Sequence, residues 1–251
     1  MSELAAWPVL AGRSLRLTLR NVESLFIALL LPVMLMLLFV YLFGGAIQTA
    51  TPQYVTYALP GVLLLCAAYG SSMTAVMVAE DMTEGIVDRF RSMDVGALSL
   101  LSGHVTASTL RNLGSVTIVF GVAFAIGFRP AAGPAGWLAA IGLLIAFIVA
   151  MSSVSAMIGL LARTTEAASG FTFFVLFLPY PSSAFVPIET MPGWLHGFAR
   201  HQPATPVIES VRGLLLDQPV GTHPWTALAW CTGLLLVAAV LAGPLFRRRT
   251  R

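Results

Sequence analysis

Apolar residues fill long stretches of this chain, and charged residues collect in the gaps between those stretches. Six stretches match the roughly 20 residues that a helix needs to cross the hydrocarbon core of a bilayer. They are residues 24–47, 56–79, 106–128, 135–161, 167–187 and 224–246. The pattern predicts an all-α membrane protein with six transmembrane helices, built as a single transmembrane domain over residues 1–251.

Composition supports that class and excludes one kind of enzyme. Hydrophobic residues make up 57% of the chain and charged residues 10%, whereas soluble domains carry about 25% charged residues. All 14 basic residues are arginine. A P-loop ATPase needs a lysine in its phosphate-binding loop, so the chain is not itself such an ATPase. Cys66 and Cys231 stand in apolar stretches and indicate neither a disulfide framework nor a thiolate metal site.

The arginines predict the orientation of the six spans. If both termini are cytoplasmic, only Arg129, Arg200 and Arg212 fall in the outer segments, and the other 11 of the 14 fall on the cytoplasmic side. That bias satisfies the positive-inside rule. We therefore expect a multi-pass protein of the cell membrane. Arg111 belongs to the third span, and we expect its side chain to extend toward the cytoplasmic surface.

The segment before the first span carries Arg13, Arg16 and Arg20 at helical spacing. Three cations on one face of a short helix predict an amphipathic helix that lies along the inner surface of the membrane. Two interpretations remain open for it. It is either a simple positive anchor or an elbow helix that brackets a transport domain.

Small residues recur at helical spacing inside the spans, and acidic residues are missing there. Ser71 and Ala75, Ser152 and Gly159, and Gly121 are positions at which helix backbones can approach closely. Ion-coupled carriers place ionisable residues at mid-membrane. No aspartate, glutamate or lysine stands near the middle of any span, so the energy source is expected elsewhere.

Charge returns abruptly after the second span, between Glu80 and Asp94. Gly85 permits a bend there. An apolar stripe runs through the segment at helical spacing and consists of Met82, Ile86, Phe90 and Met93. A stripe flanked by mixed charge is typical of a helix that docks in a groove. The alternative is a solvated loop whose apolar side rests on the membrane surface.

The outer segment 185–219 is interrupted by five prolines, so no single helix can pass through it. It predicts two short helices, one opening at Pro192 and one capped by Thr205 with Pro206 at its first position. Both are apolar enough to pack into the bundle as a re-entrant hairpin. His196, His201 and Glu209 lack the spacing of a metal site.

The fifth span is rich in aromatic residues, which are Phe171, Phe173, Phe174, Phe177 and Tyr180. Such rings suit an aromatic or lipid-like cargo. They equally suit a surface that faces lipid.

Together these segments resemble the permease subunits of ABC-2 type exporters, most closely the daunorubicin/doxorubicin resistance branch of actinobacteria. The first matching run is Asp81, Gly85, Asp88, Arg89, Phe90, Arg91 and Ser92. The second is Phe185, Val186, Pro187, Glu189, Pro192, Trp194 and Leu195, followed by Pro203, Pro206, Val211, Arg212 and Leu214. The chain departs from the family at Asp94, where proline is usual, at His104, where arginine is common, and at Gln202, where asparagine is usual.

The resemblance implies a transport subunit and not an enzyme. ATP and Mg²⁺ are expected on a separate ATP-binding subunit, present in two copies, and no cofactor on this chain. A second permease copy or a paralogue completes the pore; membrane lipids and a hydrophobic drug, antibiotic or lipid are the other expected partners, with no nucleic acid.

The resemblance also assigns site residues. The residues that couple to the ATPase are Asp81, Gly85, Ile86, Asp88, Arg89, Phe90, Arg91 and Met93, in a cytoplasmic coupling helix. The outer gate is Phe185, Pro187, Glu189, Pro192, Trp194 and Leu195. The expected substrate contacts are Phe171, Phe174, Phe177 and Tyr180.

Two other functions remain open. A related ABC-2 permease would export a polysaccharide or a lipid-linked glycan. A membrane-embedded transferase is disfavoured, because residues 80–88 lack the paired aspartates that would hold Mg²⁺ against a diphosphate.

Overall fold

The computed structural model describes residues 12, 22–45, 47, 53–84 and 97–249, and all regular structure within them is helical. The elements are α2 (Val22–Leu38), the π-helix η1 (Phe39–Phe43), α3 (Tyr54–Thr83), α5 (Ala97–Ala125), α6 (Pro134–Leu161), α7 (Thr165–Phe177), the 3-10 helix η2 (Ile188–Thr190), α8 (Gly193–His201), α9 (Ala204–Leu215) and α10 (His223–Arg249).

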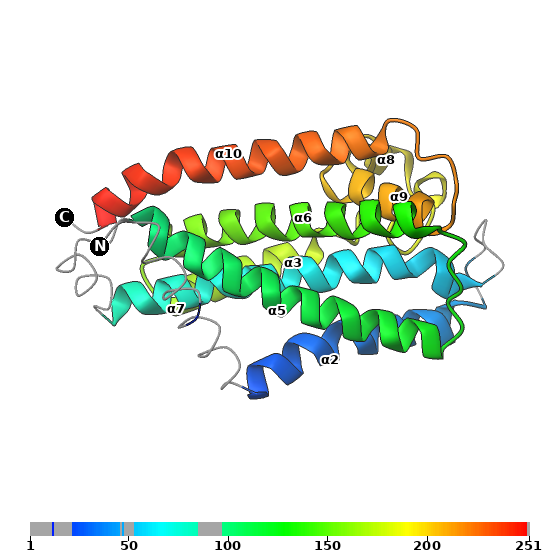
Figure 1. Ribbon diagram of the computed structural model, residues 1–251, viewed down its shortest axis with the longest axis horizontal. Coiled ribbons are helices and arrows are strands. Elements are labelled where there is room, and N and C mark those ends of the chain that lie inside the picture. The colour runs from blue at the N-terminus through cyan, green and yellow to red at the C-terminus, as the bar shows by residue number, and fades with distance from the viewer. Residues whose placement is uncertain (1–11, 13–21, 46, 48–52, 85–96, 250–251) are drawn as a thin grey trace.

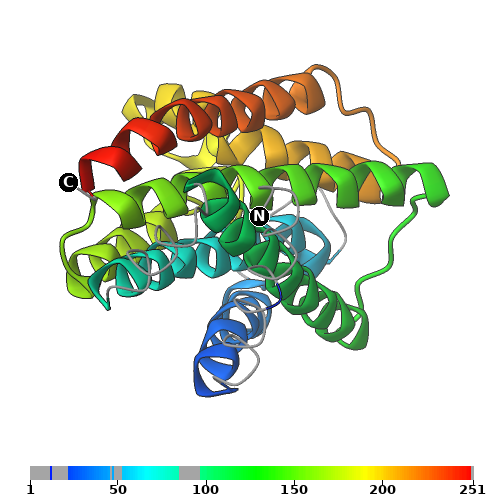
Figure 2. The ribbon, with the colours of Figure 1, turned by 60° about the vertical axis from the view of Figure 1, so that its left-hand side comes forward.

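The long helices form one bundle around α3 (Figure 1). Helix α3 contacts α2, α5, α6, α7 and α9. In the apolar 18-residue stretch of α3, 78% is buried inside the chain, whereas the corresponding share for α10 is 17%. Figure 2 confirms that α2 and α10 lie on opposite sides of the bundle. Because α3 is central, a substitution on one of its buried faces alters its packing against several helices.

Helices α8 and α9 lie together at one end of the bundle (Figure 1), here called the hairpin end. Helix α3 begins at this end, since Tyr57 contacts Arg212 of α9. Helix α5 finishes there, because the amide of Ala131 donates to the carbonyl of Leu215. Helices α6 and α10 run away from it to the opposite end, where Leu160 and Phe246 share an apolar cluster.

Four of the six expected spans are confirmed as helices long and apolar enough to cross a membrane, namely α3, α5, α6 and α10. The first expected span appears as α2 continued by η1, with Pro32 inside α2. These two segments contain 17 and 5 residues. That the first segment crosses the bilayer stays a prediction.

The fifth expected span, 167–187, is not one continuous helix. Helix α7 has 13 residues and ends at Phe177, and residues 178–186 form turns and a bend. Pro179, Pro181 and Pro187 lack the amide hydrogens that would continue the helix. Thirteen residues span about 20 Å, which is less than the roughly 30 Å of the hydrocarbon core.

Small side chains lie where α3 and α6 approach each other, as predicted. A Cβ atom on Gly159 would lie 2.6 Å from the carbonyl oxygen of Ala75 and 2.8 Å from the Cβ of Val78. The prediction is wrong for Gly121, which has open space around it. Gly121 lies on the exposed side of α5, so its lack of a side chain brings no helix closer.

Several expectations fall on residues that the structure leaves undescribed. They are the amphipathic helix with Arg13, Arg16 and Arg20, and most of the coupling segment, namely Gly85, Ile86, Asp88, Arg89, Phe90, Arg91, Ser92 and Met93. These remain predictions from the sequence.

Candidate functional site

The hairpin end is built from η2, α8 and α9, which prolines separate. Helix α8 starts at Gly193, directly after Pro192, as predicted. Helix α9 begins at Ala204, with Pro203 before it. The predicted cap by Thr205 is wrong, because α9 starts at Ala204, two residues before the predicted first position Pro206. The Thr205 hydroxyl instead donates to the carbonyl oxygen of Ala199 at 2.5 Å and so joins α9 to α8.

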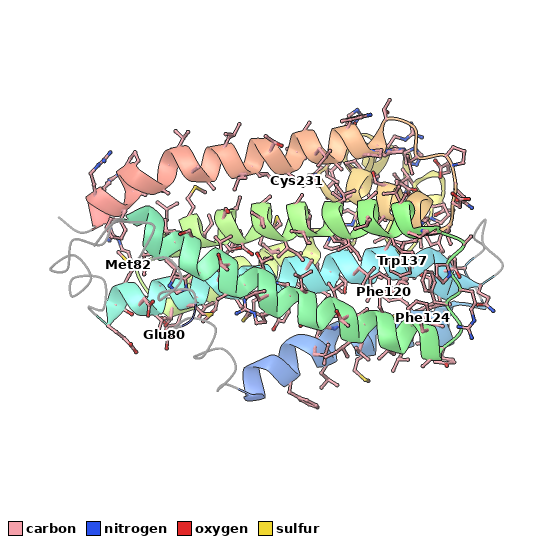
Figure 3. The ribbon with its side chains drawn as sticks, viewed as in Figure 1. Glu80, Met82, Phe120, Phe124, Trp137 and Cys231 are labelled. Atoms are coloured by element: carbon pink, nitrogen blue, oxygen red, sulfur yellow. The ribbon has the colours of Figure 1, made fainter. Side chains whose placement is uncertain are left out.

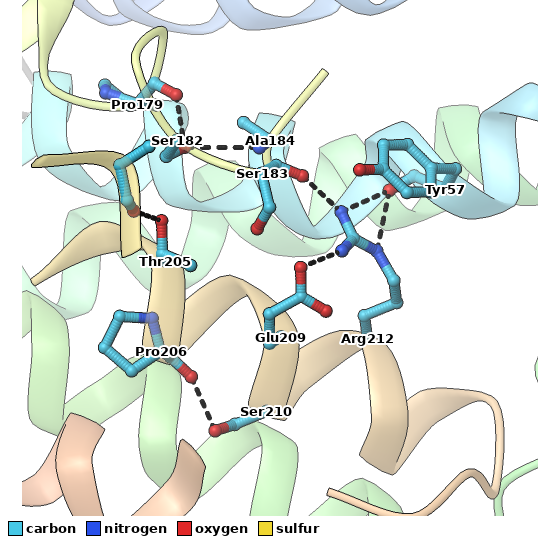
Figure 4. Close-up of polar contacts among 11 residues, drawn as sticks. Tyr57, Pro179, Ser182, Ser183, Ala184, Thr205, Pro206, Glu209, Ser210 and Arg212 are labelled. Carbon is cyan, nitrogen blue, oxygen red and sulfur yellow. Dashed lines mark hydrogen bonds and ion pairs between the residues drawn. The ribbon is translucent and has the colours of Figure 1, made fainter. Parts of the chain in front are cut away.

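A buried cation connects α9 to α3 (Figure 4). Arg212 is only 6% exposed. Its Nε and Nη2 donate to the backbone carbonyl of Tyr57 at 3.2 and 3.1 Å, and Nη2 also donates to the carbonyl of Ser183 at 2.6 Å. Its Nη1 pairs with Oε1 of Glu209 at 2.5 Å, and its guanidinium carbon lies 3.9 Å from the centroid of the Tyr57 ring. We call these four residues the Arg212 cluster.

Side chains, Arg212 among them, supply hydrogen bonds to the backbone carbonyl groups of the loop before η2. Residues 178–186 form turns, so their carbonyl groups lack the partners that a helix would supply. Side chains take that role: Tyr54 donates to the carbonyl of Phe185 at 2.7 Å, and Gln202 donates to that of Pro181 at 2.6 Å. Ser182 donates to the carbonyl of Pro179, as Figure 4 shows. This loop is therefore held to α3 on one side and to the hairpin on the other.

The expected outer gate divides between the interior and the surface of this end. Phe185 is buried at 3% exposure, whereas Trp194 is 81% exposed. Pro187 and Glu189 line an open cavity of about 570 Å³ that reaches down to Arg212. Glu189 lies 3.8 Å from Arg200, and both side chains are more than half exposed, so this pair contributes little stability. Pro192 is exposed and Leu195 is half-buried.

An aromatic ladder, defined here as Phe177, Tyr180, Phe185, Phe39 and Phe43, joins α7 to this gate. Neighbouring ring centroids are 5.9, 5.5, 4.3 and 5.5 Å apart along that order. The separations lie within or just below the range that aromatic pairs favour. The ladder brings two expected substrate contacts next to the expected gate, although the sequence separates them.

Three phenylalanine rings of α7 are exposed at its surface. Phe173, Phe174 and Phe177 are 69%, 73% and 62% exposed. Phe171 turns the other way, since it is half-buried and packs against the clusters that contain Ala75 and Ala168. Of the expected substrate contacts, Phe174 and Phe177 are therefore exposed, and Phe171 belongs to the packing of the bundle.

A polar cluster lies between α3, α5 and α6 in the middle of the bundle. The Ser152 hydroxyl lies 2.9 Å from that of Ser108 and 3.2 Å from that of Ser71. Asn112 donates to the carbonyl of Ser108 at 2.9 Å. Hydrogen bonds of this kind hold helices together where apolar side chains face an equally apolar lipid.

Arg111 belongs to the same region, which corrects an expectation. Helix α5 begins at Ala97 and ends at Ala125, so Arg111 stands at its midpoint and not near one end. Its Nη2 donates to the carbonyl of Gly70 at 2.7 Å and to Ser108 at 3.4 Å. The side chain therefore contacts α3. Arg111 is not near a helix end because α5 begins nine residues before the predicted start at 106.

At the opposite end, one residue of the predicted coupling motif is described. Asp81 in the last turn of α3 accepts a hydrogen bond of 3.0 Å from Nε2 of His104 on α5, and both residues are buried. Figure 3 shows Glu80 and Met82 at this end of the bundle. Met82 packs against a cluster that includes Val78 and Leu160, so it belongs to the bundle and not to a docking stripe.

The histidines of the hairpin end contact backbone carbonyl groups. Within the described ranges no group of three histidine, cysteine or carboxylate residues could hold a metal ion. His196 contacts the carbonyl of Met191 and His201 that of Gly197, so each interacts with its own segment.

Sequence reasoning missed the role of two residues. Arg212 belongs to the second matching run, but the sequence does not predict that it is buried. A signal was available in Glu209, which stands three residues earlier on the same helix face. His104 was noted only as a departure from the family, although an aspartate at the end of the second span offers it a partner.

The sequence also matches known proteins. The profile of the ABC-2 type transporter family covers residues 6–216. The daunorubicin resistance ABC transporter permease protein DrrB1 of Streptomyces coeruleorubidus is 30% identical over 221 residues, covering 88% of this chain and 78% of that protein. The probable doxorubicin resistance ABC transporter permease protein DrrC of Mycobacterium tuberculosis is 25% identical over 222 residues, covering 88% and 80%.

A more distant relative shares the transport class. The ABC transporter G family member 20 of Dictyostelium discoideum is 25% identical over 212 residues, which cover 77% of this chain and 28% of that protein. The long apolar helices agree with the family match over residues 6–216. The chain therefore belongs to the ABC-2 type transporter family, as an integral membrane permease.

Proposed function

We propose that this permease exports hydrophobic compounds, such as drugs, antibiotics or lipids, using ATP that a separate subunit hydrolyses. The observation that carries the proposal is the exposed aromatic face of α7, which consists of Phe173, Phe174 and Phe177. The names of two relatives, which refer to resistance to daunorubicin and doxorubicin, point to the same class of cargo.

The aromatic face supports a role in transport because of where it ends. Phe177 contacts Tyr180, and Tyr180 contacts the buried gate residue Phe185. A hydrophobic molecule held against α7 would therefore touch a chain of rings that leads to the gate. Movement of Phe185 would displace Tyr180 and Phe177, and through them a cargo that contacts Phe177.

A second permease copy or a paralogue would complete the translocation path. Helix α7 packs against α3 and α6 on one side, which leaves its aromatic side free for a partner across the cavity. The cargo would then lie between the α7 faces of two permeases. Six membrane crossings per chain and cytoplasmic termini belong to this proposal.

Two ATP-binding subunits would supply the energy and hold ATP and Mg²⁺. They would contact the segment 85–96 with Ile86, Phe90 and Met93 as the apolar contact and Asp88, Arg89 and Arg91 as its charged border. The segment follows α3 and precedes α5 in the sequence, and the Asp81–His104 hydrogen bond joins these two helices. A push on the segment would thus reach both helices at once.

The test uses the permease reconstituted in proteoliposomes with its ATP-binding subunit. Phe174→Ala and Phe177→Ala are expected to lower drug-stimulated ATP turnover several-fold and to leave turnover without drug unchanged. Val240→Ala is the matched control, since Val240 is 70% exposed on α10, away from α7. Unchanged stimulation in both phenylalanine variants would exclude α7 as the cargo surface.

A further inference from the structure

A second apolar feature, separate from the α7 face, lies between α5 and α6. It is an open groove of about 260 Å³, whose walls include Leu113, Thr117, Phe120 and Phe124 of α5 and Trp137 and Ile141 of α6. Figure 3 labels three of these side chains, Phe120, Phe124 and Trp137, near the hairpin end. The Trp137 ring centroid lies 5.3 Å from that of Phe120 and 6.3 Å from that of Phe124.

The groove is open on the outside of the bundle. Phe124 is 38% and Ile141 40% exposed, and both stand on helices that are apolar and long enough to cross a membrane. Its volume is below the roughly 300–1,000 Å³ of pockets that enclose a drug-sized ligand. The groove therefore suits one flexible chain, with the rest of the molecule lying outside it.

A cation stands at the end of the groove. The Nη1 of Arg129 donates to the carbonyl of Phe124 at 3.1 Å and to that of Phe128 at 2.8 Å. Phe124 is itself a wall of the groove, so the guanidinium is anchored to the backbone of a wall residue. Its Nε and Nη2 have no hydrogen-bond partner among the described residues, and this edge is free for an anion.

Arg129 differs in this respect from the other arginines of the hairpin end. Arg200 lies near Glu189, and Arg212 pairs with Glu209. In the part of the chain that the structure describes, Arg129 has no carboxylate partner. An exposed guanidinium whose Nε and Nη2 have no partner among the described residues, beside an apolar groove, matches the phosphate and acyl chain of a phospholipid, because a guanidinium binds phosphate oxygens in pairs.

We propose that the α5–α6 groove binds one acyl chain of a phospholipid from the leaflet around the hairpin end, with the phosphate at Arg129. The aromatic walls hold the chain, and the cation sets the depth of the headgroup. The site is independent of the α7 face and of the transported cargo. A lipid at this site would remain bound to the outer side of α5 and α6, near the hairpin end.

The test is photocrosslinking of the full-length chain in nanodiscs that contain phosphatidylglycerol with a diazirine in one acyl chain. After illumination, digestion and mass spectrometry, adducts are expected to concentrate on residues 113–144. Arg129→Gln should reduce those adducts about fivefold, the factor that corresponds to about 1 kcal/mol for one arginine near an anionic surface. Thr117→Trp, which fills the groove, should reduce them with Arg129 intact.

Two controls keep the result interpretable. Arg200→Gln removes another exposed arginine of the same end and should leave the adducts on 113–144 unchanged. Adducts on the exposed α10 residues Leu236 and Val240 report ordinary annular lipid and should not change in any variant. The proposal would be overturned if the adducts spread evenly over α5, α6 and α10, or if Arg129→Gln and Arg200→Gln gave equal yields. It would also be overturned if residues 113–144 formed crosslinks to a second copy of the chain instead of lipid adducts.

Discussion

The Arg212 guanidinium lies over the ring of Tyr57, with 3.9 Å between its central carbon and the ring centroid, and also donates to the backbone carbonyl of Tyr57. One side chain of α9 thus contacts both the ring and the main chain of a residue 155 positions earlier. It joins the hairpin to the start of the central helix. Because α3 contacts most of the bundle, this contact links the proposed gate to the helices that would move during transport.

Removing the Arg212 side chain is predicted to destabilise the protein strongly. Arg212→Ala removes a buried cation and leaves Glu209, whose side chain is 29% exposed, without its partner. Breaking a fully buried pair costs about 3–5 kcal/mol, and the partial exposure of Glu209 places the expected cost at the lower end of that range. Arg212→Lys keeps the charge but loses the planar fork that reaches Tyr57 and Ser183 together, so it should rescue only part of the loss. Thermal unfolding of the purified permease in detergent measures both effects.

The control for that prediction is Arg200→Ala. The Arg200 side chain is 57% exposed and only 3.8 Å from Glu189, and exposed pairs contribute about 0–1 kcal/mol. An equal loss of stability in Arg200→Ala and Arg212→Ala would show that the Arg212 cluster does not hold the hairpin.

A methyl group added at Gly70 is predicted to separate α3 from α5. The Cβ of Gly70→Ala would lie 2.1 Å from Oδ1 of Asn112, and overpacking of this kind costs about 1–3 kcal/mol. The loss should be smaller in an Asn112→Ala background, because the colliding amide is gone. Gly114→Ala is the matched control, since Gly114 has open space around it, and it should be neutral or slightly stabilising. Thermal unfolding compares the four variants, and a loss in Gly114→Ala as large as that in Gly70→Ala would contradict the packing argument.

The Asp81–His104 hydrogen bond is predicted to couple the ends of α3 and α5. A double-mutant cycle of Asp81→Asn and His104→Ala should give a coupling energy between about 0.6 kcal/mol, the average for side-chain hydrogen bonds between membrane helices, and about 1.7 kcal/mol, the maximum. His104→Arg, which introduces the residue common in the family, should retain ATP turnover coupled to the drug. Strictly additive single variants would mean that the contact is not energetically important.

The coupling segment is predicted to bind the ATP-binding subunit through both charge and shape. Reversing Asp88 and Arg91 together, or replacing Phe90 by alanine, should weaken association of the two proteins and lower drug-stimulated turnover. Copurification of the reconstituted complex and its ATPase rate measure these effects. The segment would lose its assigned role if both variants associated and turned over ATP normally. Ser92→Ala is a mild control within the same segment.

The local elements were predictable where composition alone dictates them. Helices α3, α6 and α10 begin within two residues of their predicted starts, because a long apolar stretch in a membrane must satisfy its backbone as a helix. The start of α5 was missed by nine residues, since Gly103 and His104 interrupt the apolar pattern while tertiary contacts stabilise the helix there. The end of α7 was missed because the loop with Pro179 and Pro181 is as apolar as a span.

The sequence by itself determined that this chain is a helical membrane permease of the ABC-2 type, because hydropathy, the absence of lysine and two motifs are properties of the residue order. Only the tertiary structure decided that Arg212 is buried over the ring of Tyr57, that Arg111 donates to the carbonyl of Gly70, and that Phe171 is half-buried while Phe174 is exposed. The physical reason is that a pattern along the chain states how apolar a segment is. Which polar group meets which partner depends on how the helices pack, and neighbours 155 residues apart leave no local signal of their contact.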